Sequence, residues 1–174
     1  MSNATSSDET FMALALDAAR TAVIHDDVPI GCVVVVGDEV VATGENRREV
    51  DADPTSHAEI VALRAAAEAR GRWRLEDATV YVSVEPCVMC AGALLNARVA
   101  RVVIGALDEK AGAVGSRYNV LADPRLLHEV PVTFDVGAEA SVALLREFFA
   151  ARRGAEPIVD DDETDTTTAG RWTT

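Results

Sequence analysis

Two short segments restrict the possible folds of this chain more than any other feature, because they lie far apart in the sequence and are predicted to meet in space. Residues 55–59 read Thr-Ser-His-Ala-Glu, and residues 85–90 read Glu-Pro-Cys-Val-Met-Cys. A histidine nitrogen and two cysteine thiolates form a ligand set that suits zinc. We therefore predict that His57, Cys87 and Cys90 bind one Zn²⁺ ion in each subunit.

The number of ligands indicates what this metal does. A structural zinc site normally has four protein ligands, whereas three leave the fourth tetrahedral position to a water molecule. Zinc lowers the pKa of a bound water toward neutrality, so hydroxide becomes available at physiological pH. Glu59 follows His57 by two residues, which turns it away from the histidine side of a helix, so we predict that it carries protons to and from this water.

Other interpretations of these residues stay open from the spacing alone. Cys87 and Cys90 could form a redox Cys-x-x-Cys pair beside an unrelated histidine, or they could belong to a structural zinc site. Glu59 could be an acid in the first turn of a helix, stabilised by the helix dipole. The three-residue spacing of the cysteines places both on one side of a helical turn, and Pro86 suits the start of that helix.

The remaining pattern predicts alternating helices and strands. Residues 6–9 offer an N-cap and an acidic first turn for a helix that runs to about residue 25. We then predict a hairpin of residues 31–36 and 39–43 around Gly37-Asp38, a helix from 57 to Gly71 and a strand over 79–84. A short helix over 90–96 and a strand over 101–105 follow, and a glycine-rich loop is expected over 105–116. The last elements are an edge strand over 130–135 and a helix over 138–153. This order predicts an α/β fold, a three-layer α/β/α sandwich with a mixed central sheet of about five strands.

Composition sets the domain organisation and the expected environment. With 174 residues, 49% of them hydrophobic, the chain can form one domain over residues 1–153. Residues 154–174 are acidic and poor in apolar side chains, so we expect a disordered tail. No secretory signal or membrane-spanning run is evident, so we expect a cytoplasmic protein without a membrane partner. Cys32 lies in an apolar run and is expected to be a small buried residue.

The charge balance points to high salt. The formal net charge is −13, and Lys110 is the only lysine among otherwise arginine cations. A strongly acidic, lysine-poor surface suggests a halophilic host, since net charge governs solubility and association rather than fold. Such a protein repels phosphate at low salt, but molar salt shortens the Debye length to roughly 3 Å.

The motif pair and three longer segments together resemble one family. H-x-E combined with P-C-x-x-C is the known signature of the zinc-dependent nucleobase deaminases. Residues 53–60, 85–93 and 105–116 resemble the tRNA-specific adenosine deaminases, which make inosine at the wobble position. The likeness runs from about residue 11 to residue 153. It implies a cytidine deaminase-like fold, a homodimer and hydrolytic deamination of a base in a tRNA anticodon loop.

The resemblance also implies roles for residues around the metal. Asn46 matches the asparagine that hydrogen-bonds the target base, and an apolar wall is implied at Val28, Pro29 and Ile30. Backbone groups of Ala58 and Glu85, and the side chain of Asp108 against the substrate's sugar, complete the implied substrate-binding set. Asn46 could instead be a turn residue at a strand end, and Asp108 an ordinary loop aspartate.

Two functional alternatives remain beside the tRNA enzyme. The lack of a basic field favours a deaminase of a free nucleobase or nucleoside, such as guanine or cytosine, that acts in salvage. A zinc-stabilised binding module is the non-enzymatic alternative, but such a scaffold has no use for Glu59 beside an open metal. Arg47-Arg48 departs from the pattern of the tRNA enzymes at the expected rim of the substrate site.

Overall fold

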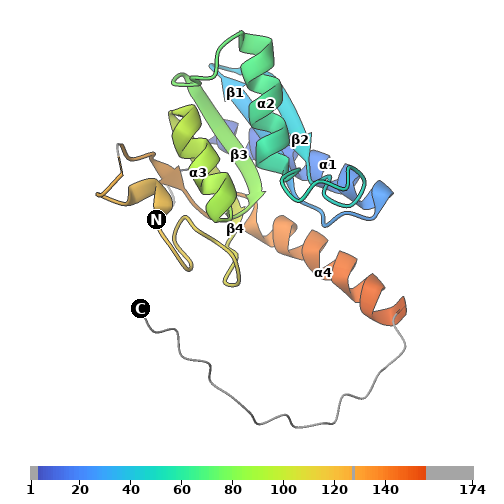
Figure 1. The fold of residues 1–174 in the computed structure, drawn as a ribbon. Helices are drawn as coiled ribbons and strands as arrows, with labels where there is room; N and C mark the ends of the chain where they lie inside the picture. The colour runs from blue at the N-terminus through green and yellow to red at the C-terminus, as the bar shows by residue number, and fades with distance from the viewer. Residues whose placement is uncertain (1–3, 127, 156–174) are drawn as a thin grey trace, which may run out of the picture.

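A five-stranded mixed sheet forms the centre of the molecule (Figure 1). The computed structural model describes residues 4–126 and 128–155. The strands are β1 (Gly31–Val36), β2 (Glu39–Glu45), β3 (Ala78–Val84), β4 (Arg101–Ala106) and β5 (Val132–Thr133), in the order β2-β1-β3-β4-β5. β1 pairs antiparallel with both β2 and β3, whereas β3, β4 and β5 run parallel.

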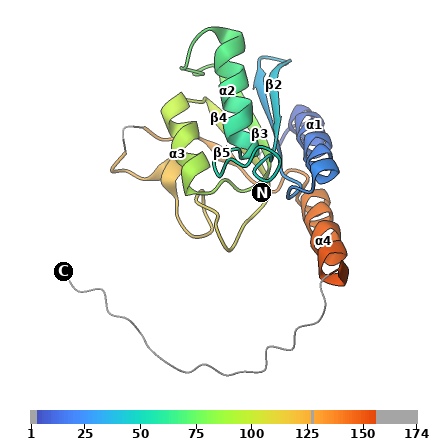
Figure 2. The same cartoon turned by 45° about the vertical axis from the view of Figure 1, so that its right-hand side comes forward.

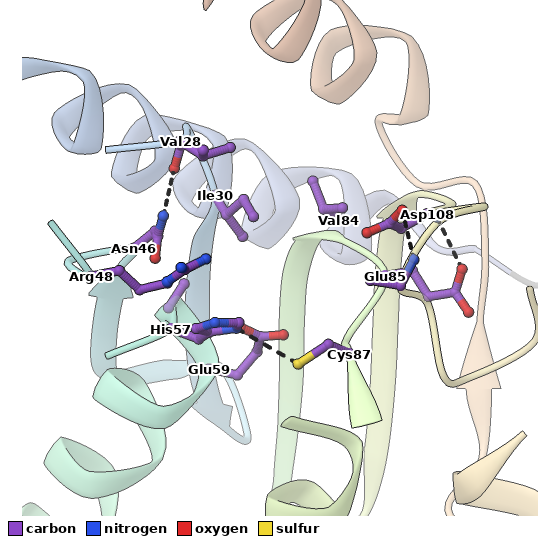
Figure 3. Close-up of a pocket in the computed structure, with 12 residues that line it drawn as sticks. Val28, Ile30, Asn46, Arg48, His57, Glu59, Val84, Glu85, Cys87 and Asp108 are labelled. Atoms are coloured by element: carbon purple, nitrogen blue, oxygen red, sulfur yellow. Dashed lines mark hydrogen bonds between the residues drawn. The ribbon is translucent and has the colours of Figure 1, made fainter. Parts of the chain in front are cut away.

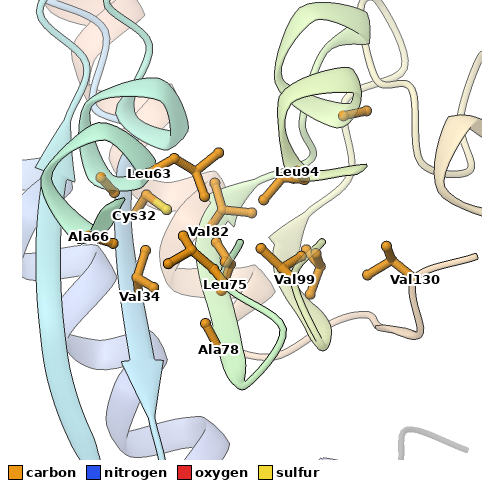
Figure 4. Close-up of a cluster of buried hydrophobic side chains, with 14 of the residues drawn as sticks. Cys32, Val34, Leu63, Ala66, Leu75, Ala78, Val82, Leu94, Val99 and Val130 are labelled. Carbon is orange, nitrogen blue, oxygen red and sulfur yellow. The ribbon is translucent and has the colours of Figure 1, made fainter. Parts of the chain in front are cut away.

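Helices cover both faces of this sheet, which confirms the predicted three-layer sandwich (Figure 2). The helices are α1 (Ser6–Ala22), α2 (Ala58–Arg70), α3 (Val88–Ala97) and α4 (Ala138–Ala155), with 3₁₀ turns at Val23–His25 and Val120–Ala122. Val82 of β3 packs in one core cluster with α2 and α3 (Figure 4), and Val80 belongs to the same cluster. Tyr81 packs in another cluster with α1. Successive strand residues point to opposite faces, so both layers need apolar strands.

The hairpin and helix starts follow local sequence rules. Val36 pairs with Glu39, and Gly37 between them adopts a φ of 62°, which a glycine tolerates without strain. The N-cap of α1 is Thr5, one residue before the segment predicted to supply it. The Thr5 hydroxyl accepts from the Asp8 backbone N–H, and the Asp8 carboxylate accepts from the Thr5 N–H, which forms a capping box.

The element ends differ modestly from the predicted ones. α3 starts at Val88 rather than residue 90, and the edge strand predicted over 130–135 is only Val132–Thr133. α4 continues through Ala155, so the first two residues of the predicted tail belong to the helix. The rest of that tail, residues 156–174, lies outside the described residues. Within 4–126 and 128–155, no helix combines the length and apolarity that crossing a bilayer requires.

A buried carboxylate ties α1 to the sheet. Asp8 is 1% exposed, and it accepts hydrogen bonds from both terminal nitrogens of Arg101 at 2.9 and 3.0 Å and from the Tyr81 hydroxyl at 2.9 Å. Burial by itself would raise the pKa of Asp8, but the hydrogen bonds from Arg101, Thr5 and Tyr81 outweigh it and lower the pKa to about 2. This cluster therefore holds its negative charge at neutral pH.

Asp8→Asn is expected to lower the free energy of unfolding by about 3 kcal/mol at pH 7, because it leaves the Arg101 charge without its partner. The folded-state pKa of Asp8 is below its unfolded value, so its stabilisation is present above about pH 4 and is lost as the pH falls toward 2. Urea unfolding of both proteins between pH 7 and pH 3 measures this. Asp17→Asn, at an exposed ion pair of the same helix, should change stability by less than about 1 kcal/mol; an equal loss in both variants would contradict the prediction.

Candidate active site

The predicted metal ligands meet where two helices begin beside the carboxyl end of β3. His57 is the N-cap residue of α2, and Cys87 is the N-cap residue of α3. β3 ends at Val84, and Glu85 and Pro86 connect it to Cys87. Both helix dipoles therefore direct their positive ends at this point, which favours thiolates and other negative charge.

The three ligand atoms have a geometry that suits zinc. His57 Nδ1 lies 3.7 Å from Cys87 Sγ and 3.5 Å from Cys90 Sγ, and all three ligand atoms lie within 4.8 Å of one another. In a tetrahedral site with ordinary Zn–N and Zn–S bonds, nitrogen and sulfur are about 3.6 Å apart. Both nitrogen–sulfur distances thus suit a zinc ion held by one imidazole and two thiols. Cys32 is fully buried in the core beside α2, as predicted.

Burial and mutual hydrogen bonding adjust the acidity of these groups. A hydrogen bond with Cys90 lowers the pKa of the Cys87 thiol to about 3, so this sulfur is a thiolate at neutral pH. Glu59 is 4% exposed in the first turn of α2, and burial raises the pKa of its carboxyl to about 7. A carboxyl group with this pKa can both accept and release a proton at neutral pH.

A pocket of about 230 Å³ opens beside the ligands (Figure 3). Its volume is below the roughly 300–1,000 Å³ of drug-sized ligand sites, so it suits a single base. Most of the predicted site residues line it: Val28, Ile30, Asn46, His57, Ala58, Glu59, Glu85, Cys87 and Asp108. Pro29 and Cys90 are buried and do not line it. Val84 and Ala111 also line it, although the sequence did not single them out, and so does Arg48, which was expected at the rim of the substrate site.

Asn46 is fixed at the pocket wall by two hydrogen bonds. Its side-chain amide nitrogen donates to the Val28 carbonyl at 3.2 Å, and its backbone N–H donates to the Ile30 carbonyl at 2.9 Å. The side chain is 5% exposed. With one amide hydrogen engaged, the amide oxygen and the second hydrogen can still accept and donate.

The Glu85 side chain has a role that the prediction did not include. Backbone groups of Glu85 were predicted to contact the substrate; of these, the N–H donates to the Ala106 carbonyl at 2.8 Å. Its carboxylate instead accepts from the backbone N–H groups of Asp108, Val114 and Ser116, each at 3.0 Å, and from the Ser116 hydroxyl. One buried carboxylate therefore holds the loop that follows β4.

A neighbouring glycine is part of the same arrangement. A Cβ atom at Gly112 would overlap the Glu85 carboxyl group and the Asp108 carbonyl. A glycine is thus required at position 112 because the loop backbone approaches Glu85 closely there. The signal in the sequence was an acidic residue directly after a buried strand, but only the fold shows which loop it meets.

Glu85→Gln is expected to loosen this loop, because an amide supplies one acceptor and adds a donor that faces three backbone N–H groups. Hydrogen exchange at Asp108, Val114 and Ser116 should become at least about tenfold faster, while zinc content stays unchanged. Glu76→Gln is the control, since Glu76 is exposed and distant from the loop. Unchanged protection of the three amides in Glu85→Gln would contradict this role.

Asp108 is partly accounted for by its own loop. One carboxylate oxygen accepts from the backbone N–H groups of Lys110 at 2.9 Å and Ala111 at 3.2 Å. Its own N–H donates to Glu85. Asp108 also lines the pocket, so both the loop role and the predicted substrate role are compatible with this position.

Comparisons with known proteins define the class. Residues 5–106 match the family described as the cytidine and deoxycytidylate deaminase zinc-binding region. The chain belongs to this family, and it is a zinc-dependent hydrolytic deaminase.

Individual relatives show which members of this family the chain resembles. The chain is 42% identical to the tRNA-specific adenosine deaminase of Haemophilus influenzae over 152 residues, 87% of this chain and 88% of that protein. A solved structure from studies of A-to-I editing by tRNA:A34 deaminases has 43% identity and a TM-score of 0.76, and the match covers 78% of this chain and 99% of that one. A guanine deaminase from Nitrosomonas europaea is 26% identical with a TM-score of 0.71, over 86% and 87% of the two chains. The resemblance to the tRNA enzymes is confirmed.

Proposed function

We propose that this deaminase converts adenosine to inosine at the wobble position of tRNA. The observation that carries the proposal is a pocket for one base, with a zinc ligand set and a buried carboxyl group on its wall. The tRNA-specific adenosine deaminase relatives supply the substrate class. An enzyme that takes one base out of a single-stranded loop needs a deep pocket more than an extended basic surface.

The proposed chemistry replaces the amino group of adenine with oxygen from water and releases ammonia. His57, Cys87 and Cys90 would hold a zinc ion, which would supply an activated water. Glu59 takes a proton from that water and delivers protons to the ring nitrogen and to the leaving amino group. Its pKa of about 7 suits both directions of transfer.

The pocket wall is proposed to orient the base. Val28 and Ile30 provide apolar contact, and the free acceptor and donor of Asn46 bind the polar edge of the purine. Ala58 is the first residue of α2, so its backbone N–H has no partner within the helix and can bind substrate. Asp108 is proposed to contact the sugar.

A product assay tests the proposal. The wild type and a Glu59→Ala blank are incubated in molar KCl with an anticodon stem-loop that carries adenosine at the wobble position, and with free adenine, adenosine, guanine, cytosine and cytidine. Inosine in the stem-loop alone supports the tRNA enzyme. Ammonia released from a free base, with the RNA unchanged, would overturn it in favour of a salvage deaminase. The likeness to the Nitrosomonas guanine deaminase makes that the second candidate.

We further propose a homodimer. Trp73, Val88 and Leu126 are exposed apolar side chains along an apolar groove beside α3, the helix that contains Cys90. Exposed apolar patches of this kind favour association. Sedimentation equilibrium in molar KCl should give twice the 18.5 kDa chain mass, and a monomer at micromolar concentration would contradict the proposal.

The expected setting is a cytoplasm rich in salt. The net charge of −13 supports this, because an acidic surface stays soluble where salt screens its self-repulsion.

We propose that residues 1–153 form the deaminase domain and that residues 156–174 are dispensable for it. Activity of the chain truncated after Ala155 should equal that of the full chain at high salt.

A further inference from the structure

One cation at the pocket makes no ion pair within the described residues. Arg48 is exposed and lines the pocket, and Figure 3 shows its side chain directed toward the pocket between Ile30 and His57. Its backbone carbonyl accepts from the Asp53 N–H at 3.2 Å, but within residues 4–126 and 128–155 its guanidinium makes no hydrogen bond or ion pair. Its neighbour Arg47 is bound by Glu45 at 3.1 Å and by Asp51 at 2.9 Å.

Two acids close to Arg48 in the chain or in space, Asp27 and Asp53, are engaged by other groups. Asp27 is buried and accepts from the backbone N–H groups of Glu49 at 3.0 Å and Val50 at 3.2 Å, so it fixes the turn that follows Arg48. Asp53 accepts from the backbone and hydroxyl of Thr55, both at 2.7 Å. The segment is thus built so that one arginine is neutralised and the next remains available.

An unpaired guanidinium at this position can bind an anionic group of the substrate. In the part of the chain that the structure describes, Arg48 is the only lysine or arginine that lines the pocket, and the chain as a whole has a net charge of −13. A nucleobase is uncharged, so it gives a guanidinium nothing to neutralise. A phosphate group attached to the nucleoside does, because the planar guanidinium binds two phosphate oxygens at once.

We propose that Arg48 forms a subsite for a phosphate group on the target nucleotide, at the mouth of the pocket. The shared chemistry is a phosphate ester, which could come from a phosphodiester of an RNA strand or from the 5′-phosphate of a free mononucleotide. The RNA source rests on the function proposed above. This subsite would select a nucleotide over the free base that fits the same pocket.

Arg48→Gln is the test variant, and Arg74→Gln is its matched control. Both substitutions remove one positive charge, but Arg74 lies between α2 and the start of β3, at the opposite end of that strand from the site. Binding of the anticodon stem-loop to the Glu59→Ala protein, followed by fluorescence anisotropy over a range of KCl concentrations, gives a readout that does not depend on turnover.

Arg48→Gln should weaken binding of the stem-loop about tenfold and reduce the slope of log K against log salt by about 0.7, the value for one contact to single-stranded nucleic acid. Arg74→Gln should change neither quantity. A second stem-loop carries a single uncharged methylphosphonate beside the target nucleotide. The protein that retains Arg48 should bind this stem-loop as weakly as Arg48→Gln binds the normal stem-loop. No further loss should follow when both changes are combined.

The outcomes separate this inference from the proposed function. Suppose that the wild type makes inosine but that the normal stem-loop binds equally well with and without Arg48. This result would overturn the phosphate subsite and leave the proposed function standing. If no inosine forms, adenosine 5′-monophosphate and adenosine replace the RNA. A tenfold loss for the monophosphate alone in Arg48→Gln would then support the phosphate subsite with a mononucleotide as its ligand, and no loss would overturn it.

Discussion

Glu59→Ala is expected to reduce deamination by at least about 10³-fold and to leave the zinc content and the fold intact. Glu59 is a buried carboxyl group on the pocket wall and lies outside the group formed by His57, Cys87 and Cys90. General acid–base catalysis contributes about 10²–10⁴-fold, and here one group is proposed to handle every proton. The assay is single-turnover deamination with zinc measured on the same sample.

A second glutamate of the same helix provides the control. Glu68 is exposed near the end of α2, so Glu68→Ala removes the same group far from the pocket and should retain full activity. Turnover within tenfold of wild type in Glu59→Ala would exclude Glu59 as the proton carrier. A loss of zinc in that variant would instead indicate that Glu59 belongs to the metal site.

Cys87→Ala is expected to bind zinc at less than about one tenth of wild-type occupancy and to lose activity in proportion. Removal of one thiolate leaves His57 and Cys90 as protein ligands, which is one fewer than a catalytic zinc site requires. The melting temperature should also fall, because the metal joins the first residues of α2 and α3. Metal analysis after dialysis measures the occupancy.

Cys32→Ala tests whether this loss is specific to the ligand. Cys32 is a fully buried thiol in β1 that lies outside the ligand set, so its variant should keep full zinc occupancy with only a modest loss of stability. Full occupancy in Cys87→Ala would mean that the ligand set is wrong.

Local rules accounted for the features that depend on neighbouring residues. The apolar run of β1 and the turn at Gly37 predicted the hairpin, and the spacing of Cys87 and Cys90 predicted two ligands on one helix start. The resemblance to known deaminases also predicted most of the residues that line the pocket.

Features that depend on contacts between distant segments could not be predicted this way. The Glu85 carboxylate reaches loop amides up to 31 positions along the chain, and no local pattern names that partner. The sequence shows Arg47 and Arg48 as equivalent, whereas the acids around them neutralise only the first. The first feature depends on which loop meets the carboxyl end of β3, and the second on the conformation of the segment that follows β2.

Mapping inosine along an intact tRNA tests the central claim most directly. A tRNA with adenosine at the wobble position is treated with the zinc-loaded enzyme in molar KCl, and every adenosine is then read by sequencing. The account predicts inosine at the wobble position and nowhere else, and none with Glu59→Ala. An unmodified tRNA, or inosine spread over many adenosines, would contradict a pocket that takes one base from the anticodon loop.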